Sequence, residues 1–185
     1  MSSKTEDIRK SYLAFRLDEE IFAVGVAKVL EILEMQPITK VPKTPKYMRG
    51  VINMRGEVIP VVDTRLKFNM PMTEDTIRTV IIVLELQIKN KKVVLGAIAD
   101  SVNEVMEISD NEIREVPDIG SKYNTEFIMG MVKSGEYFIM ILDIDKVFSM
   151  EDITMIKNDN YDSECGEKTT PENNKIELEI NETDN

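Results

Sequence analysis

Few side chains in this sequence could do chemistry, and the most distinctive of them lie in one short segment. Asn53 and Arg55 are separated by one residue in a hairpin-like stretch, and a single acid, Glu31, stands among aliphatic residues upstream. If the strand extends that far, the side chains of Asn53 and Arg55 point to one face, since strand residues alternate. An arginine there either ties down backbone carbonyls of its own chain or binds the carboxylate of a partner. The residues alone favour neither alternative.

The sequence lacks the residue types that most often carry catalysis. It contains no histidine and one cysteine, Cys165, so the commonest general base near neutral pH and the commonest metal ligand are missing. It also contains no phosphate-binding loop, dinucleotide fingerprint, metal-ligand spacing or Ser/His/Asp set. We therefore expect no enzymatic activity, no cofactor and no metal.

Charge and composition argue against further classes of protein. A formal net charge of −11 opposes binding to nucleic acid or to an anionic membrane surface, both of which need a basic face. One cysteine leaves no intramolecular disulfide and suits a reducing compartment. The first residues contain no apolar core of a signal peptide, and the longest apolar runs are strand-sized. We expect a cytoplasmic protein.

The elements that must position Asn53 and Arg55 follow one plan that the chain uses twice. Similar residues recur 73 to 80 positions later, as in the pairs Glu31/Glu104, Gly50/Gly130, Asp63/Asp143 and Phe68/Phe148. Two copies of a small β unit can build a scaffold with a seam between them, and a seam is a natural binding site. The polar pair belongs to the first copy alone, because Lys133 and Gly135 stand at the corresponding positions of the second.

Short apolar runs separated by turn residues predict about ten strands and only brief helices. The expected strands are 12–17, 20–24, 32–41, 50–54, 58–62, 80–86, 93–99, 102–108, 113–116, 128–132 and 137–142. Short helical turns are expected at 25–29, after Asp63 as a helix cap, and at 143–150. The pattern indicates an all-β architecture of two small barrels within 8–150, with subdomains at roughly 8–75 and 76–150.

Residues 154–185 differ in character from the rest of the chain. They hold nine Asp and Glu against three Lys, and so contribute −6 of the total charge of −11. Such a segment cannot bury enough apolar surface to offset the entropy lost on ordering. We expect a disordered acidic C-terminal tail, although the alternating residues 176–180 could instead add a strand to the edge of a partner.

Three segments together resemble the CheW family of bacterial chemotaxis coupling proteins. They are 29–32, 38–45, and 50–63 with its Asn-x-Arg-Gly hairpin, and the match runs from about Tyr12 to Met150. The resemblance implies two SH3-like five-stranded β-barrels packed on a shared hydrophobic core. It also implies a non-enzymatic adaptor that links the tip of methyl-accepting chemoreceptors to the regulatory domain of the histidine kinase CheA.

The resemblance carries over to a set of candidate contact residues for the kinase and the receptor. These are Val29, Glu31, Ile32, Gly50 and Arg55, to which we add Asn53 of the same hairpin and Val102, the counterpart of Val29. The receptor tip is expected to dock in the groove between the barrels. Partners, rather than the bilayer, are expected to recruit the chain to membrane-associated receptor arrays.

The alternative from another class is a small-molecule-binding or enzymatic β-barrel protein that uses the inter-barrel groove. The missing histidine and the lack of clustered catalytic side chains disfavour it.

Overall fold

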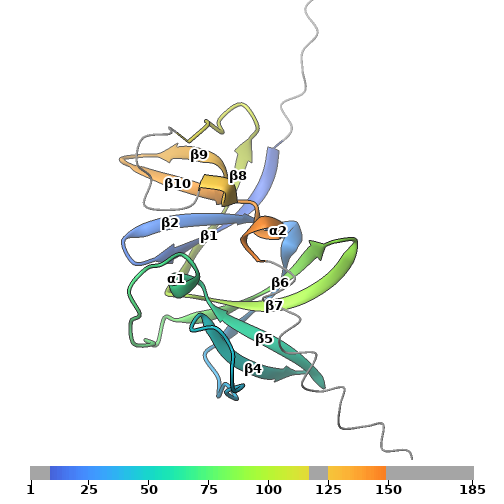
Figure 1. The fold of residues 1–185 in the computed structure, drawn as a ribbon. Helices are drawn as coiled ribbons and strands as arrows, with labels where there is room; N and C mark the ends of the chain where they lie inside the picture. Colours follow the sequence, from blue (N-terminus) through green and yellow to red (C-terminus); the bar gives the residue numbers. More distant parts are fainter. Residues whose placement is uncertain (1–8, 117–124, 149–185) are drawn as a thin grey trace, which may run out of the picture.

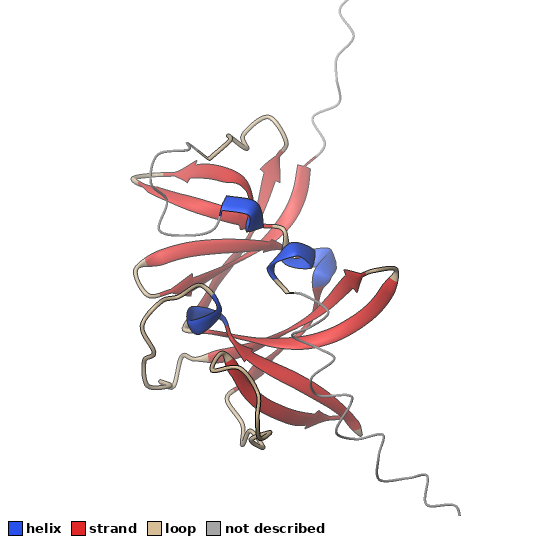
Figure 2. Ribbon diagram, in the orientation of Figure 1, coloured by secondary structure: helices blue, strands red, loops and turns tan. Residues whose placement is uncertain are grey.

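The computed structural model describes residues 9–116 and 125–148, which form two five-stranded sheets with short helices between them (Figures 1 and 2). Sheet I has the strand order β8-β1-β2-β10-β9, and sheet II has the order β3-β6-β7-β5-β4. The expected all-β class with two five-stranded units is confirmed. The expected disordered tail, 154–185, lies outside the described residues.

Sheet I is built from both ends of the described chain and sheet II from its middle. The strands of sheet I are β1 Arg9–Leu17, β2 Glu20–Gly25, β8 Ser101–Ser109, β9 Ile128–Ser134 and β10 Tyr137–Leu142. Those of sheet II are β3 Val29–Glu34, β4 Met48–Met54, β5 Glu57–Asp63, β6 Val80–Ile88 and β7 Lys91–Ala99. The helices are η1 Val26–Lys28, α1 Thr64–Lys67, η2 Thr125–Phe127 and α2 Ile144–Val147.

The two sheets do not coincide with the expected subdomains 8–75 and 76–150. The hairpin β1–β2 opens the first pass yet pairs with β8 and β10 of the second, and β6–β7 opens the second pass yet pairs with β3 and β5 of the first. The first hairpin of each pass is therefore part of the sheet that contains the remaining strands of the other pass. Because a repeat shows which elements recur and not which of them pair, it does not show which sheet each hairpin joins.

Several strands are buried on both faces, which explains their nearly continuous apolar sequences. In β6, Ile81 and Val83 pack inside sheet II, whereas Ile82 and Leu84 pack into a core that the two sheets share. In β2, Ala23 packs inside sheet I, whereas Phe22 and Val24 join the shared core. The molecule therefore has one core within each sheet and a larger one between them.

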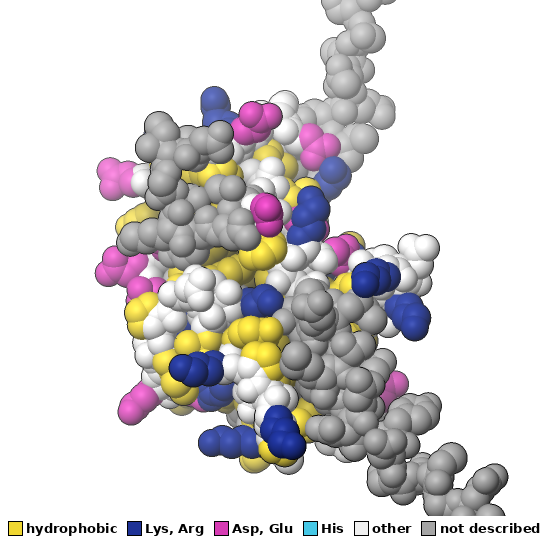
Figure 3. Space-filling model, in the orientation of Figure 1, with side chains coloured by type: hydrophobic (Ala, Val, Ile, Leu, Met, Phe, Trp, Pro, Cys, Tyr) yellow, Lys and Arg dark blue, Asp and Glu magenta, His cyan; other side chains and the backbone are white. Residues whose placement is uncertain are grey.

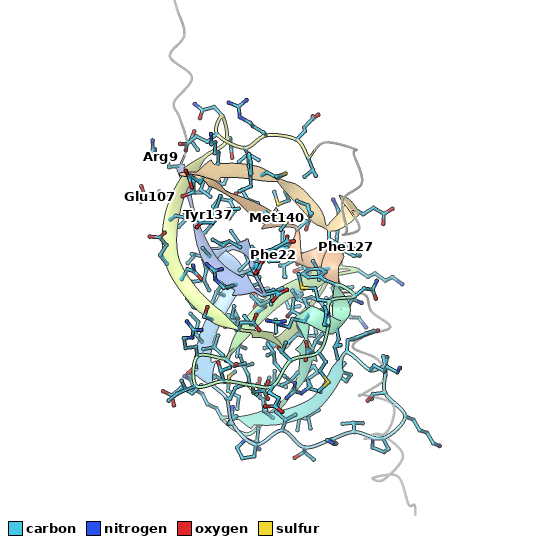
Figure 4. The ribbon with its side chains drawn as sticks, turned by 90° about the vertical axis from the view of Figure 1, so that its left-hand side faces the viewer. Arg9, Phe22, Glu107, Phe127, Tyr137 and Met140 are labelled. Atoms are coloured by element: carbon cyan, nitrogen blue, oxygen red, sulfur yellow. The ribbon has the colours of Figure 1, made fainter. Side chains whose placement is uncertain are left out.

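The shared core also uses residues that recur in the repeat. Phe68 and Phe148 are both buried in it, and the Phe22 ring stacks on Phe68 with 5.5 Å between ring centroids. On the sheet I side, Met140 of β10 pairs with Phe22 of β2, and Met140 and Phe127 both pack against the same core (Figure 4). These contacts confirm the expectation of a hydrophobic core between the two units.

The segments that follow β3 and β8 are less regular than the expected strands 32–41 and 113–116. Between residues 35 and 47 only Thr39 pairs in a β-bridge, with Val51, and in 110–116 only Arg114 does, with Met131. Prolines interrupt the first of these segments, and a proline cannot donate a ladder hydrogen bond. Among the described residues, no helix is long and apolar enough to cross a bilayer.

Candidate functional site

The hairpin β4–β5 places Asn53 and Arg55 at one end of sheet II. Met54 pairs with Glu57, so Arg55 and Gly56 form a two-residue turn, and both have positive φ (55° and 89°). Those angles are typical of a type I′ turn, whose twist suits a β-hairpin. The Asn53 side-chain oxygen accepts a hydrogen bond from the Gly56 N–H at 3.0 Å. Asn53 therefore shapes the turn that presents Arg55.

The corresponding turn of the second pass explains part of the difference between the copies. Ser134 pairs with Tyr137, and Gly135 opens that turn with φ of 60°. Glycine adopts this backbone conformation without strain, whereas an arginine at the same place accepts some strain. The first pass thus keeps an exposed guanidinium where the turn alone would favour glycine.

Arg55 reaches the other candidate residue of opposite charge. Its Nη2 lies 3.0 Å from Glu31 Oε2, and the side chains are 79% and 32% exposed, respectively. Neither sequence-based alternative for Arg55 describes this contact, which is an ion pair within the chain. An ion pair this exposed contributes about 0–1 kcal/mol to the free energy of unfolding. Stability therefore gives little reason for an arginine at this turn.

The ion pair also joins the two outer strands of sheet II. Glu31 lies on β3 and Arg55 at the end of β4, which are the first and last strands of the sheet order. The paired backbone hydrogen bonds between Thr39 and Val51, at 2.9 and 2.8 Å, connect the segment after β3 to β4. Sheet II is thereby curled toward a closed barrel.

Exposed apolar side chains flank this ion pair. On β3 the side chains alternate, so that Leu30 (51% exposed) and Ile32 (42%) face solvent while Leu33 packs into the core of sheet II. Val58, near the start of β5, is 55% exposed. We use the name β3 face for the exposed surface around this outer strand, which holds Leu30 and Ile32 on one side of β3, Glu31 with Arg55 on the other, and Val58. Leu30 and Val58 were missed from the sequence, although the alternation of β3 could have identified Leu30.

Gly50 has a structural role that its family association did not predict. It is buried and has φ of +139°, and a Cβ at this position would lie 2.1 Å from the Thr39 carbonyl oxygen. Gly130 is placed in the same way, with a Cβ 2.8 Å from the Arg114 carbonyl oxygen. The repeated glycine lets each irregular segment approach the neighbouring strand. That Gly50 also contacts the kinase or the receptor stays a proposal.

Val29 and Val102, two further candidate contact residues, are not part of the β3 face. Val29 is the first residue of the outer strand β3 and Val102 the second of the outer strand β8; they are equivalent in the repeat, and each is half-buried against the shared core. A pocket of about 400 Å³ opens where β1 meets the end of β2 and the segment that crosses to β3. The lining is Lys10, Ser11, Tyr12, Gly25, Val26 and Ala27. None of these residues belongs to a strand of sheet II, so the pocket is not the groove between the two units that the sequence led us to expect.

Comparisons with known proteins place this arrangement in a family. The sequence model of the CheW-like domain matches residues 11–152 of the chain. The chain belongs to the CheW family. The CheW chemotaxis protein of Rhizobium meliloti is 36% identical over 143 residues, covering 77% of this chain and 90% of that protein. The CheW chemotaxis protein of Klebsiella aerogenes is 30% identical over 153 residues, covering 83% and 90%.

A solved structure agrees with the sequence comparisons. The crystal structure of the scaffolding protein TtCheW from Thermoanaerobacter tengcongensis matches with a TM-score of 0.68 and 30% identity, covering 82% of this chain and 96% of that one. The CheW fold, and the role of a chemotaxis coupling adaptor that the resemblance implied, are thereby confirmed for this CheW-family chain. The names of these relatives give no support to the small-molecule alternative.

Proposed function

We propose that this CheW-family chain is a non-enzymatic adaptor that bridges methyl-accepting chemoreceptors to the histidine kinase CheA. The observation that carries the proposal is the β3 face, where Leu30 and Ile32 stand exposed beside the Glu31–Arg55 ion pair. Apolar side chains next to a charged rim are typical of a protein–protein contact. Small-molecule sites, by contrast, are concave and enclose their ligand.

The β3 face is the proposed contact for the regulatory domain of the kinase. Within the sheets of the described chain, β3 pairs only with β6, so its other edge is free of a strand partner. Leu30 and Ile32 supply apolar anchors, and Arg55, 79% exposed, retains donors that a partner's carboxylate can use. Anchors of this kind carry most of the binding energy of an interface, and the surrounding polar residues exclude water.

The seam is the proposed contact for the receptor tip. The pocket of about 400 Å³ beside Tyr12 and Val26 is large enough for apolar side chains of a docked segment. Val29 and Val102 pack against the core beneath the seam from the two sheets. A receptor seated there touches sheet I and the link that leads to sheet II, whereas the kinase touches sheet II itself.

Two contacts on one folded body would let a change in the receptor bias the activity of the kinase. Coupling of this kind is a free energy shared between two sites, and each partner then alters the binding of the other. The chain is proposed to act in the cytoplasm, and to be held at membrane-associated receptor arrays through its partners.

Replacing Arg55 with alanine is expected to reduce receptor-dependent activation of the kinase without unfolding the protein. A charge-assisted hydrogen bond to a partner contributes about 1.5–3 kcal/mol, whereas the exposed pair with Glu31 contributes at most about 1 kcal/mol to folding. Kinase phosphorylation rates in a reconstituted mixture and thermal unfolding of the variant test this. Lys133→Ala, in the equivalent hairpin of the second pass, is the matched control. An Arg55→Ala protein that folds and activates like the unmodified chain would refute the role of Arg55.

A further inference from the structure

The chain passes between the two sheets twice within the described residues. It crosses from β2 to β3 through Gly25–Lys28, and from β7 to β8 through Asp100. Lys28 and Asp100 therefore take equivalent places, each immediately before the strand that follows a crossing. Both side chains make ion pairs, and the carboxylate of each pair also accepts a backbone hydrogen bond, so that each cluster connects one sheet to the other.

At the second crossing, Asp100 binds residues associated with both sheets. Arg65 of α1, which follows β5 of sheet II, donates from Nε to Asp100 Oδ1 at 2.7 Å and pairs with the other carboxylate oxygen as well. Asp100 Oδ2 accepts the backbone N–H of Asp18, in the turn of β1–β2 of sheet I, at 2.6 Å. The Asp100 carboxylate raises the pKa of Arg65 above its ordinary value. Arg65 is 11% exposed and Asp100 23%.

At the first crossing, Asp145 takes the corresponding place with the charges exchanged. It lies on α2, which follows β10 of sheet I, and its Oδ2 is 2.6 Å from Nζ of Lys28. Its Oδ1 accepts the backbone N–H of Gln87, near the tip of the hairpin β6–β7 of sheet II, at 2.8 Å. In Figure 1 α2 lies beside η1 and β6, and in Figure 3 the β6–β7 hairpin projects from the body with basic side chains at its end.

The two clusters share one plan, and the helix residue of each cluster follows the repeat. Arg65 and Asp145 each lie two residues after the aspartate at the N-cap position of their helix, Asp63 and Asp143, and each pairs with the residue at a crossing. In each cluster a carboxylate also accepts an N–H from a hairpin of the other sheet. The carboxylate sits on the crossing in one cluster and on the helix in the other.

We propose that these two clusters are clamps that fix the orientation of one sheet relative to the other. Apolar burial in the shared core holds the sheets together but is not directional, whereas ion pairs and hydrogen bonds of fixed geometry are. Because the kinase and receptor contacts proposed above lie on and between the sheets, the clamps keep both contacts in one rigid body. That consequence rests on the proposed function; the clamping itself does not.

The test measures the orientation of the sheets without any partner. Spin labels are placed on cysteines introduced at Val58 of sheet II and Glu107 of sheet I, with Cys165→Ser to remove the native thiol. Pulsed electron spin resonance then gives the distribution of distances between the labels. Asp100→Asn combined with Asp145→Asn is expected to broaden that distribution while the circular dichroism spectrum stays unchanged. Should the double variant fail to fold, Asp145→Asn alone carries the test.

Two further variants make the test specific. Asp110→Asn removes the same charge from an exposed pair with Lys10 (55% and 59% exposed) within sheet I, and is expected to leave the distribution narrow. Asp145→Arg is expected to broaden it, and adding Lys28→Asp, which copies the Arg65–Asp100 arrangement, is expected to narrow it again. The proposal would be overturned if the distance distribution stayed narrow in the folded Asp100→Asn/Asp145→Asn protein. It would also be overturned if adding Lys28→Asp to Asp145→Arg left the distribution as broad as before.

Discussion

Gly50→Ala is expected to lower the free energy of unfolding by about 3 kcal/mol or more. The added Cβ would lie 2.1 Å from the Thr39 carbonyl oxygen, a backbone atom that cannot move aside cheaply. The backbone at Gly50 also has φ of +139°, where a side chain is strained. Relief requires the Thr39 segment to leave β4, which breaks its hydrogen bonds to Val51. Chemical denaturation followed by circular dichroism measures the loss.

Gly25→Ala is the matched control for this prediction. Gly25 has φ of −55°, and a Cβ at this position has no atom within 4 Å. Its substitution is expected to change the free energy of unfolding by less than about 1 kcal/mol. If Gly50→Ala were as stable as the unmodified chain but failed to bind a partner, Gly50 would be a contact residue, and its packing against Thr39 would not matter.

Ile32→Asp is expected to reduce the affinity for the regulatory domain of the kinase by about 2 kcal/mol or more, roughly thirtyfold in the dissociation constant. The substitution removes an apolar anchor from the β3 face and places a carboxylate beside Glu31. Because Ile32 is 42% exposed and lies on an outer strand, stability should change by less than about 1 kcal/mol. Isothermal titration calorimetry with the isolated kinase domain measures the affinity.

Val105→Asp provides the comparison, since Val105 occupies the place of Ile32 in the second pass and is 59% exposed. It adds the same charge to the outer strand β8 of sheet I, away from the β3 face. Its affinity for the kinase domain should stay within about twofold of the unmodified chain, a change below about 0.5 kcal/mol. Equal losses in both variants would show that charge, rather than the position of Ile32, weakens binding.

Much of the local structure could be predicted from the sequence because it depends on near neighbours. Asp63 caps α1, its side chain accepting the Leu66 N–H at 3.2 Å, as the sequence led us to expect. The two hairpins around Arg55 and Gly135 also form where their turn residues predict. In both cases the determining residues lie within a few positions of each other.

What could not be predicted depends on contacts between residues far apart in sequence. The ion pair of Arg55 with Glu31 spans 24 positions and exists only because sheet II curls. The exchange of hairpins between the passes is set by pairings between strands distant in sequence, such as β1 with β8 and β5 with β7, which the repeat does not encode. The roles of Asp100 and Asp145 could not be predicted from the sequence, because the backbone N–H groups that they bind lie far away along the chain.

The central claim, that the chain bridges two partners through separate contacts, has a direct test. The cytoplasmic fragment of a chemoreceptor is immobilised, and the regulatory domain of the kinase is added with and without this chain. The kinase domain is expected to be retained only when the chain is present, with no loss of bound chain from the receptor as more kinase domain is added. Displacement of the chain from the receptor by the kinase domain would contradict the claim, because it would mean that both partners compete for one surface.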